Sequence, residues 1–199
     1  CPETRLGNKW ESQFTINHIG HFLLTQELMD TMAENDCARF VSLSSSAHSL
    51  TGILWDDIHF QNNPYDKWMA YGQSKTASSL IAIEFHRRMI DKGVSGFSVH
   101  PGGIITPLQR HLEKEEMVAL GWMDEDGSPS ELAKNFFKST SQGASTALWC
   151  ATSAAEQQPC ELMNYTLRLR MRSACGDAEQ LYGVSRAKWT RKKRVFHAS

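Results

Sequence analysis

A long helix between two short apolar strands is the feature that most constrains the fold of this chain. Residues 39–43 (R-F-V-S-L) and 96–100 (G-F-S-V-H) are short, β-prone and followed by turn-forming residues, as buried strands are. Residues 68–90 carry Ala, Ser, Leu and Ile on one side, and residues 91–93 (D-K-G) then supply a stop signal for a helix. A strand, a helix and a strand in this order form a crossover between parallel neighbours. The sequence therefore predicts an α/β fold with a parallel sheet.

The rest of the chain predicts further helices and two irregular stretches. Residues 14–32 have apolar side chains on two faces, so we expect a helix that is buried on more than one side. Residues 46–67 carry Gly, Pro, Asn and Asp, which is typical of irregular structure. Residues 106–141 form a polar excursion with short helical pieces, and residues 142–152 and 177–188 are predicted to be helices.

A tyrosine and a lysine lie four positions apart near the start of the long helix. Tyr71 and Lys75 would share one helix face, and a lysine charge roughly 5 Å from a phenol favours the phenolate by ~3 kcal/mol at an effective dielectric of about 20. That corresponds to about two pKa units, enough for general acid or base chemistry. Residues 44–46 (S-S-S) and 101–103 (P-G-G) end the two strands at the edge where such sheets bind ligands. The alternative is an ordinary helix tyrosine beside a solvated lysine.

Composition and charge exclude several classes of protein. The 199 residues carry a formal net charge of −1, which gives no overall attraction to nucleic acid or to a membrane surface. Nine Arg or Lys residues stand against three acids from Glu161 to Ser199, and a solvated tail explains this run better than a nucleic-acid patch. No stretch of about eighteen apolar residues could span a membrane, and no signal peptide opens the chain.

The cysteines and histidines do not predict a metal site. Five cysteines are scattered, odd in number and without C-x-x-C or zinc spacing, which indicates free thiols in a reducing compartment. We therefore expect a cytoplasmic protein with no metal, no nucleic-acid partner and no membrane span. Four histidines lack a carboxylate or cysteine that would complete a ligand set, so packing roles are favoured for His18, His21, His48 and His100.

Four motifs follow one another in a fixed order along the chain. They are Asn17–Thr25 (N-H-I-G-H-F-L-L-T), Arg39–Ser45 (R-F-V-S-L-S-S), Tyr71–Lys75 (Y-G-Q-S-K) and His100–Thr106 (H-P-G-G-I-I-T). Their order and spacing resemble the second half of the short-chain dehydrogenase/reductase family. The 26-residue step from Ser45 to Tyr71 resembles the retinol-dehydrogenase-like and WW-domain-oxidoreductase-like branch of that family. The resemblance covers residues 8–155.

The resemblance implies a doubly wound Rossmann-type domain and a role for each matching residue. Tyr71 would exchange a proton with the oxygen of an alcohol or carbonyl substrate, and Lys75 would lower the pKa of Tyr71 and bind the nicotinamide ribose. Ser45 would donate a hydrogen bond to the reacting oxygen, as the second serine of the strand-end pair. Asn17 would hold a water that links Lys75 to solvent. Ser44 and its neighbour Ser46 are interpreted as turn serines.

The resemblance also implies a cofactor, a substrate class and a partner. The chain would contact the nicotinamide through Tyr71, Lys75, Pro101, Gly102, the backbone of Ile104 and the hydroxyl of Thr106. The cofactor would be NADP or NAD, with NADP slightly preferred by family analogy, and it carries the hydride. The substrate would be an apolar alcohol, aldehyde or ketone, and Met117, Trp122 and Met123 would line its loop or pack in the core. Helices near 14–32 and 68–90 would form a homodimer interface.

Two departures from the family pattern remain. The thirteen glycines contain no T-G-x-x-x-G-x-G or G-x-G-x-x-G, so the first strand–helix units of the domain are expected to lie upstream of Cys1, in an N-terminally truncated chain. Residues 1–155 are thus interpreted as the catalytic C-terminal part of the domain. Residues 156–199 are interpreted as a divergent basic C-terminal segment. The alternative function is a catalytically inactive fragment that serves as a dimerisation or interaction module.

Overall fold

The computed structural model shows an α/β fold and describes residues 1–7, 9–35 and 37–153. In chain order the elements are β1 (Arg5–Leu6), β2 (Trp10–Glu11), α1 (Ser12–Phe14), the π-helical turn η1 (Thr15–Gly20), α2 (His21–Ala33), β3 (Arg39–Leu43), the 3-10 turn η2 (Ser46–Ser49), α3 (Lys67–Met89), the 3-10 turn η3 (Ile90–Lys92), β4 (Ser95–Val99), the 3-10 turn η4 (Pro107–His111), α4 (Lys114–Ala119), α5 (Glu131–Phe136) and α6 (Thr140–Thr152). The predicted helix at 177–188 and the basic run beyond residue 161 lie outside the described residues.

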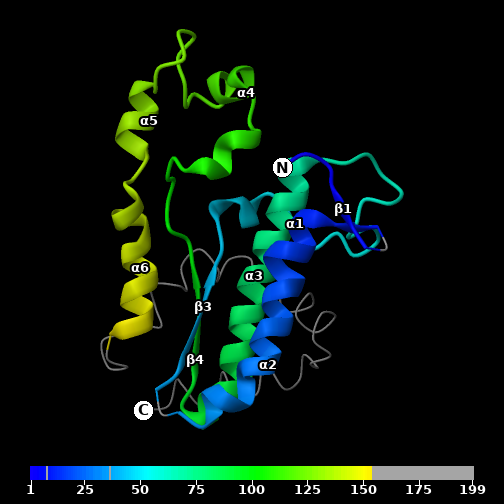
Figure 1. Cartoon of the computed structure of the whole chain (residues 1–199), viewed down its shortest axis with the longest axis vertical. Helices are drawn as coiled ribbons and strands as arrows, with labels where there is room; N and C mark the ends of the chain where they lie inside the picture. Colours follow the sequence, from blue (N-terminus) through cyan, green and yellow to red (C-terminus); the bar gives the residue numbers. More distant parts are fainter. Residues whose placement is uncertain (8, 36, 154–199) are drawn as a thin grey trace, which may run out of the picture.

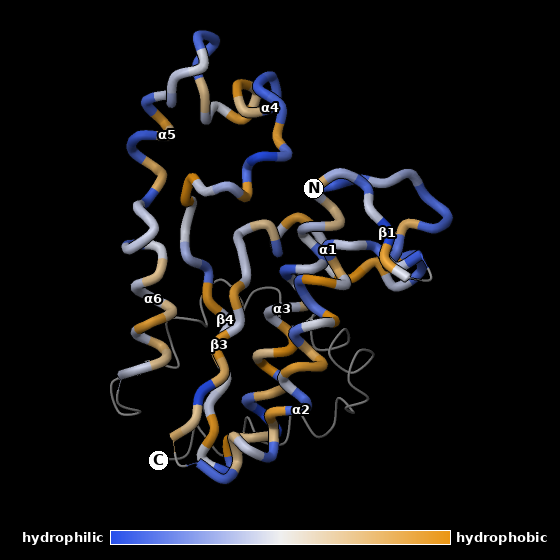
Figure 2. The backbone as a smooth tube through the Cα atoms, viewed as in Figure 1, coloured by the Kyte–Doolittle hydropathy of each residue, from blue (hydrophilic) through white to orange (hydrophobic). Residues whose placement is uncertain are grey.

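The predicted crossover is confirmed. β3 and β4 pair in parallel, with Arg39 opposite Ser95 and Leu43 opposite Val99, and α3 connects them (Figure 1). The helix α3 packs on both strands and α6 packs on the side away from it, so both faces of the pair are covered. Both strands mix apolar residues with serines along their length (Figure 2). The second strand begins at Ser95, one residue before its predicted start.

The start of the long helix is fixed by its N-cap residue, and its close packing on β4 depends on one glycine of that strand. The Asp66 carboxylate caps α3 by accepting the backbone N–H groups of Trp68 and Met69 at 2.8 and 2.9 Å. The buried face of α3 carries Ala70, Ala77, Leu80, Ile81, Ala82, Phe85 and Met89. Gly96 of β4 has no room for a side chain, because a Cβ there would lie 2.6 Å from the Ala82 carbonyl oxygen. The absence of that carbon lets the strand approach the helix closely.

The predicted helix at 14–32 is present, although its burial was predicted wrongly. Residues 12–33 are helical throughout, with a π-helical turn at 15–20 that the pattern did not indicate. The expectation of burial on more than one side fails, because four apolar side chains of this segment are between 45% and 59% exposed. They are Ile16, Leu23, Leu24 and Leu28. Its buried positions, such as Phe14 and Thr25, lie on the side toward α3.

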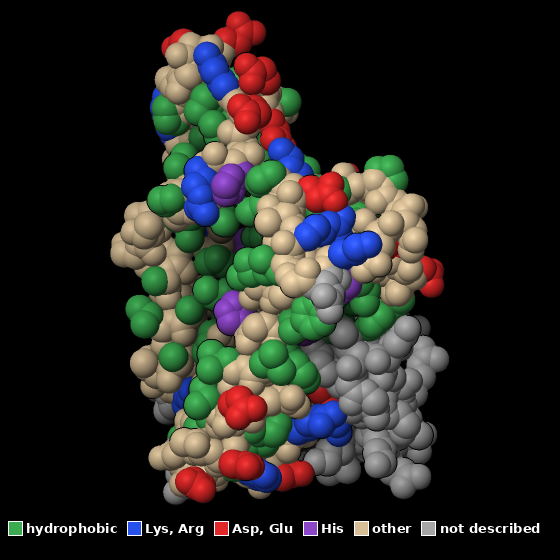
Figure 3. Space-filling model, turned by 45° about the vertical axis from the view of Figure 1, so that its right-hand side comes forward, with side chains coloured by type: hydrophobic (Ala, Val, Ile, Leu, Met, Phe, Trp, Pro, Cys, Tyr) green, Lys and Arg blue, Asp and Glu red, His purple; other side chains and the backbone are tan. Residues whose placement is uncertain are grey.

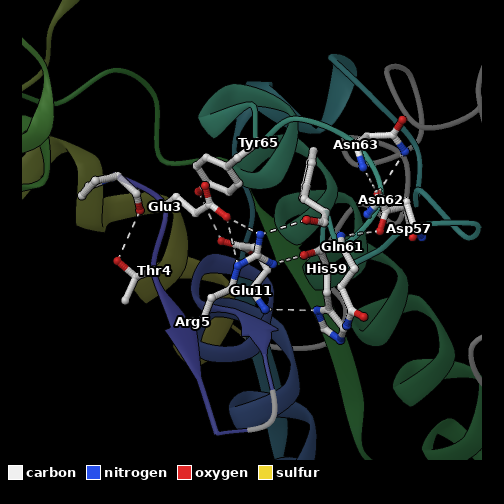
Figure 4. Close-up of polar contacts among 12 residues, drawn as sticks. Glu3, Thr4, Arg5, Glu11, Asp57, His59, Gln61, Asn62, Asn63 and Tyr65 are labelled. Atoms are coloured by element: carbon white, nitrogen blue, oxygen red, sulfur yellow. Dashed lines mark hydrogen bonds and ion pairs between the residues drawn. The ribbon is translucent and has the colours of Figure 1, made fainter.

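The segment between η2 and α3 packs on the N-terminal part of the chain. Ile53 joins Phe14, Ala77 and Leu80 in a buried cluster, with Trp55 and Ile58 against it. Figure 4 shows the polar side of this contact, where Arg5 donates to the carbonyls of His59 and Phe60, and the His59 ring accepts from the Glu11 backbone at 3.2 Å. The fully buried Glu11 carboxylate caps α1 and accepts from Tyr65 at 3.3 Å. Many hydrogen bonds therefore order a segment that looked irregular.

Residues 104–138 leave the carboxyl end of β4 and return to it. Their base is closed by a parallel bridge between Ile104 and Lys138, where the Lys138 N–H donates to the Gly103 carbonyl at 2.8 Å. Trp122 packs edge-on against Phe137 inside this excursion, with ring centroids 5.3 Å apart. Among the helices that the structure describes, none combines the length and apolar character needed to cross a membrane.

Candidate functional site

The second and third turns of α3 carry the tyrosine and the lysine on one face. Tyr71 and Lys75 are both half-buried, and the Lys75 Nζ lies 5.6 Å from the centroid of the Tyr71 ring. The same ammonium donates a hydrogen bond to the Leu43 carbonyl at 3.0 Å, at the last residue of β3. The pair thus faces the carboxyl end of the sheet, the edge where the strand order predicted a site.

Ser45 reaches the same place from β3. It is extended (φ −152°) and caps η2 by accepting the Ala47 N–H at 3.2 Å, and, against the effect of burial, its side chain lowers the pKa of the Tyr71 phenol. The close approach of η2 to α3 needs Gly72, because a Cβ at that position would lie 2.9 Å from the Ala47 carbonyl oxygen. The glycine of the Tyr-Gly-Gln-Ser-Lys motif therefore has a structural task, which is to admit the loop that carries Ser45.

Asn17 lies in the π-helical turn and contacts α3 beside the lysine. The Asn17 side-chain Nδ2 donates to the hydroxyl of Ser74, one residue before Lys75, at 3.1 Å. The Asn17 backbone carbonyl accepts from the Ser78 hydroxyl at 3.3 Å. The wider π-helical turn is a common feature of functional positions in helices. The structure thus brings Asn17 next to the pair, and its water-holding role stays a prediction.

The loop after β4 completes the edge. Gly102 has a φ of +93°, which turns the backbone between Pro101 and the bridge at Ile104. The Thr106 hydroxyl is occupied at the start of η4, where it caps the turn by accepting the Leu108 N–H at 3.2 Å. Thr106 is therefore already engaged in a cap, and its contact to a nicotinamide stays a prediction, as do those of Pro101, Gly102 and Ile104.

A chain of buried serines, which the sequence interpretation missed, supports the site. Ser44 was interpreted as a turn serine, but it is buried and its hydroxyl donates to the Lys75 carbonyl at 3.0 Å. The Ser79 hydroxyl contacts the Ser44 hydroxyl at 2.8 Å and the Ser98 hydroxyl at 3.1 Å. These contacts tie both strands to α3. Serines at alternate strand positions opposite a Ser-Ser pair in the helix were the available signal.

Of the four histidines for which packing roles were favoured, His18 is a buried packing residue, whereas His21 and His100 are exposed. His18 is 4% exposed and packs between the tilted rings of Phe14 and Phe22, with ring-centroid distances of 5.1 and 6.2 Å. Burial lowers the pKa of His18 from 6.5 to about 4, and its Nδ1 has no hydrogen-bond partner among the residues that the structure describes. Over residues 1–7, 9–35 and 37–153 no group of three or more His, Cys, Asp or Glu side chains could hold a metal ion.

A family comparison agrees with this geometry. The family model described as short chain dehydrogenase matches residues 3–117, which is more than half of the chain. The chain belongs to the short-chain dehydrogenase family. This match spans the π-helical turn, both strands, α3 and the loop after β4, so all the predicted site residues of this short-chain dehydrogenase lie inside it.

Curated relatives confirm the retinol-dehydrogenase-like resemblance. A protein named "Probable oxidoreductase" from Streptomyces lividans is 40% identical over 144 residues, covering 72% of this chain and 48% of that protein. "Retinol dehydrogenase 12" from Mus musculus is 36% identical over 193 residues, covering 93% and 56%. "Retinol dehydrogenase 11" from Homo sapiens is 36% identical over 155 residues, covering 76% and 44%. The short-chain dehydrogenase described here thus spans about half the length of the curated relatives it matches.

The pKa predicted for the tyrosine of this short-chain dehydrogenase needs correction. We expected Lys75 to lower the pKa of Tyr71, whereas burial raises it and only the Ser45 hydrogen bond opposes that rise. Burial also lowers the pKa of Lys75 itself. The physical reason is that the ammonium points to the Leu43 carbonyl and the phenol is partly removed from water, so desolvation outweighs the charge.

The residues at this edge fit one end of a nicotinamide cofactor, the group that this family uses. An ammonium has three donors and the Leu43 carbonyl takes one from Lys75, so two remain for ribose hydroxyls. No T-G-x-x-x-G-x-G loop occurs in the sequence to cradle a diphosphate. The short-chain dehydrogenase residues present here therefore fit the nicotinamide ribose and offer no glycine-rich loop for the other end.

Proposed function

We propose that this chain carries the proton-exchanging part of an NAD(P)-dependent oxidoreductase that interconverts an apolar alcohol and its carbonyl compound. The observation that carries the proposal is the meeting of Tyr71, Lys75 and Ser45 at the carboxyl end of β3 and β4. Three proton donors converge there on one edge of a parallel sheet, where folds of this class bind ligands. Membership of the short-chain dehydrogenase family supports the same chemistry.

In the reducing direction, the phenol of Tyr71 gives its proton to the carbonyl oxygen of the substrate. The Ser45 hydroxyl, which lies on the loop that packs against α3 near Tyr71, donates to the same oxygen and stabilises the charge that develops on it. The Tyr71 phenol, whose pKa is raised by burial, is protonated at neutral pH and so has a proton to give. When bound, a reduced nicotinamide would supply the hydride for the carbonyl carbon, and this hydride together with the proton from Tyr71 would give the alcohol.

Lys75 would act after the proton has left. Its ammonium stabilises the phenolate of Tyr71, and its two remaining donors would hold the ribose hydroxyls. Asn17, hydrogen-bonded to Ser74, would hold a water through which the tyrosine regains its proton. These assignments rest on the residue positions and on the motif matches together.

An apolar substrate is supported by the surface of the excursion at 104–138. Five large apolar side chains there are between 38% and 58% exposed: Ile105, Leu108, Leu120, Leu132 and Phe136. Two relatives carry the name retinol dehydrogenase, and retinol is an apolar alcohol. A long-chain aldehyde is therefore the substrate class that we propose, with NADP preferred to NAD, in a cytoplasmic homodimer that pairs α2 and α3. The exposed apolar side chains of α2 suit such an interface.

The test is turnover by the recombinant chain. We expect oxidation of NADPH, or of NADH, to depend on added long-chain aldehyde and to saturate with it. The rival function is an inactive fragment that acts as a dimerisation module. Titration with NADPH and NADH, followed by tryptophan fluorescence, separates the two. Saturable cofactor binding supports the enzyme, whereas its absence, together with a dimer in solution, would establish the rival for this chain.

A further inference from the structure

A single carboxylate joins the excursion to the start of the tyrosine helix. Glu116 lies in α4, and one of its oxygens accepts from the Lys67 Nζ at 2.5 Å while the other accepts from the Trp68 Nε1 at 2.9 Å. Both oxygens are thus engaged, one with a cation and one with a neutral donor. The contact is partly shielded, because the side chains of Lys67 and Glu116 are 31% and 23% exposed.

The two donors stand directly before the reacting tyrosine. Lys67 and Trp68 are the first two residues of α3, and they precede Tyr71 by four and three positions. Residues at these spacings lie on one face of a helix. The Glu116 carboxylate therefore binds the first turn of α3, on the face of the helix that also carries Tyr71. Glu116 itself follows Tyr71 by more than forty positions in the sequence.

The same excursion is anchored at its base by the bridge between Ile104 and Lys138. The described contacts thus hold it at two places, the base beside Gly103 and the carboxylate at Glu116. Between them lie exposed apolar side chains such as Leu108 and Ile105. A segment fixed at both places spans the sheet edge where Tyr71 and Ser45 lie, as the ribbon shows above β3 and β4 (Figure 1).

We propose that Glu116 is a positioning residue that clasps the excursion at 104–138 to the start of α3. The clasp fixes the apolar side chains of the excursion beside the site, so it governs how well the apolar part of a substrate binds and leaves proton transfer at Tyr71 unchanged. This inference rests on the proposed function for its substrate, and on the contacts of Lys67 and Trp68 for the clasp itself.

A neighbouring glutamate provides a matched control. Figure 3 shows acidic side chains gathered at the end of the molecule that α4 and the following turn form, and Glu113, Glu115, Asp124, Glu125 and Asp126 are the exposed acids of this stretch. Glu115 stands next to Glu116 in the same helix and is exposed. Glu115→Ala thus removes an identical side chain and charge without touching the clasp.

The first experiment needs no activity. Trypsin can cleave after Arg110 and Lys134 inside the excursion, two sites whose flanking residues are the same in both variants, and the initial rates are followed by mass spectrometry. Losing the clasp in Glu116→Ala should speed these cleavages about fivefold, as expected when about 1 kcal/mol of a partly exposed ion pair and hydrogen bond is lost. Glu115→Ala should cleave at the wild-type rate. Equal rates for wild type and Glu116→Ala would overturn the clasp.

The second experiment asks what the clasp does for the substrate. In Glu116→Ala the KM for a long-chain aldehyde should rise about fivefold, with kcat and the KM for propanal unchanged. Trp68→Phe, which removes one donor, should give a smaller rise. Equal changes for long and short aldehydes, or a fall in kcat, would overturn the positioning role. If wild type itself shows no turnover, the proposed function fails, while the trypsin rates still decide whether the clasp exists.

Discussion

The strand–helix unit of β3, α3 and β4 and the excursion at 104–138 are held in different ways. In the unit, buried hydroxyls run from Ser44 through Ser79 to Ser98, at 2.8 and 3.1 Å, and bind both strands to the helix. The excursion keeps large apolar side chains exposed and is joined to the rest at its base and through Glu116. The residues that we propose to exchange a proton therefore lie on the tightly bonded part, and the surface that we propose for the substrate lies on the loosely bonded one.

The difference between the strand–helix unit and the excursion suggests how one fold could keep its chemistry while its substrate varies. Groups that exchange a proton need fixed positions, and Tyr71 and Lys75 receive them from a buried helix. A surface that binds an apolar chain needs a large apolar area and does not need atoms at fixed positions. Exposed segments such as this one tolerate sequence change.

The largest effect should follow loss of the proton donor. Tyr71→Phe keeps the ring and removes the hydroxyl, so we expect aldehyde reduction to fall by about 100- to 10,000-fold, the range for a general acid. The measurement is kcat from NADPH oxidation, with cofactor affinity measured beside it. Tyr65→Phe is the control, because it removes a phenol that bonds to Gln13 and Glu11. It should cost about 1 kcal/mol of stability and leave kcat unchanged.

Acid should destabilise the fold through His18, which lies in the π-helical turn η1 that contacts α3. The pKa of His18 in the folded chain is about 4, below the ordinary 6.5. Between these two pH values His18 is therefore protonated in the unfolded chain and neutral in the folded chain. The contribution of neutral His18 to the free energy of unfolding is fully present above pH 6.5. It declines as the pH falls toward 4, by about 3 kcal/mol in all. Urea unfolding at several pH values measures this. His18→Gln should remove that part of the decline, and an unchanged pH dependence in the variant would exclude His18 as its source.

Gly72→Ala tests the close approach that places Ser45. The new Cβ would meet the Ala47 carbonyl oxygen at 2.9 Å, so we expect a loss of about 1–3 kcal/mol from crowding and a lower kcat as Ser45 moves away from Tyr71. Urea unfolding and steady-state kinetics measure the two effects. Gly20→Ala is the control, because the nearest atom there is 3.6 Å away. A lower kcat in the control would show that the effect is not specific to this approach.

The smallest effect should come from one link of the buried hydroxyl chain. Ser79→Ala leaves the Ser44 and Ser98 hydroxyls without their shared partner, which should cost about 1–2 kcal/mol of unfolding free energy. The exposed Ser46 offers the matched change, and Ser46→Ala should stay within about 0.5 kcal/mol of wild type. Equal losses in the two variants would mean that the hydroxyl chain adds nothing to the rigidity of the unit.

Much of the fold could be predicted from local pattern. The β-α-β order gave the parallel pair with one strand displaced by one residue, because short apolar runs and a stop at Gly93 are strong local signals. The meeting of Ser45 and Tyr71 followed from the rule that ligands bind at strand ends. Asn17 was predicted from a motif, and the π-helical turn that places it beside Ser74 has no simple sequence pattern.

What could not be predicted depends on contacts between distant segments. The Glu116 carboxylate meets Lys67 and Trp68 across nearly fifty positions, and no periodicity encodes that pairing. The direction of the Tyr71 pKa was mispredicted, since spacing alone gives the lysine charge and not the burial that outweighs it. The exposure of Leu23 and Leu24 was also missed, because hydropathy tells which side chains are apolar and not which of them find a partner.

The most direct test of the central claim, that a nicotinamide lies at the carboxyl ends of β3 and β4, is hydrogen exchange with and without saturating NADPH. Peptides covering residues 43–48 and 101–106 should exchange more slowly with the cofactor present. Peptides covering 57–66, which pack on the N-terminal segment, should be unaffected. Unchanged exchange at both strand ends, or slowing confined to 57–66, would contradict the account.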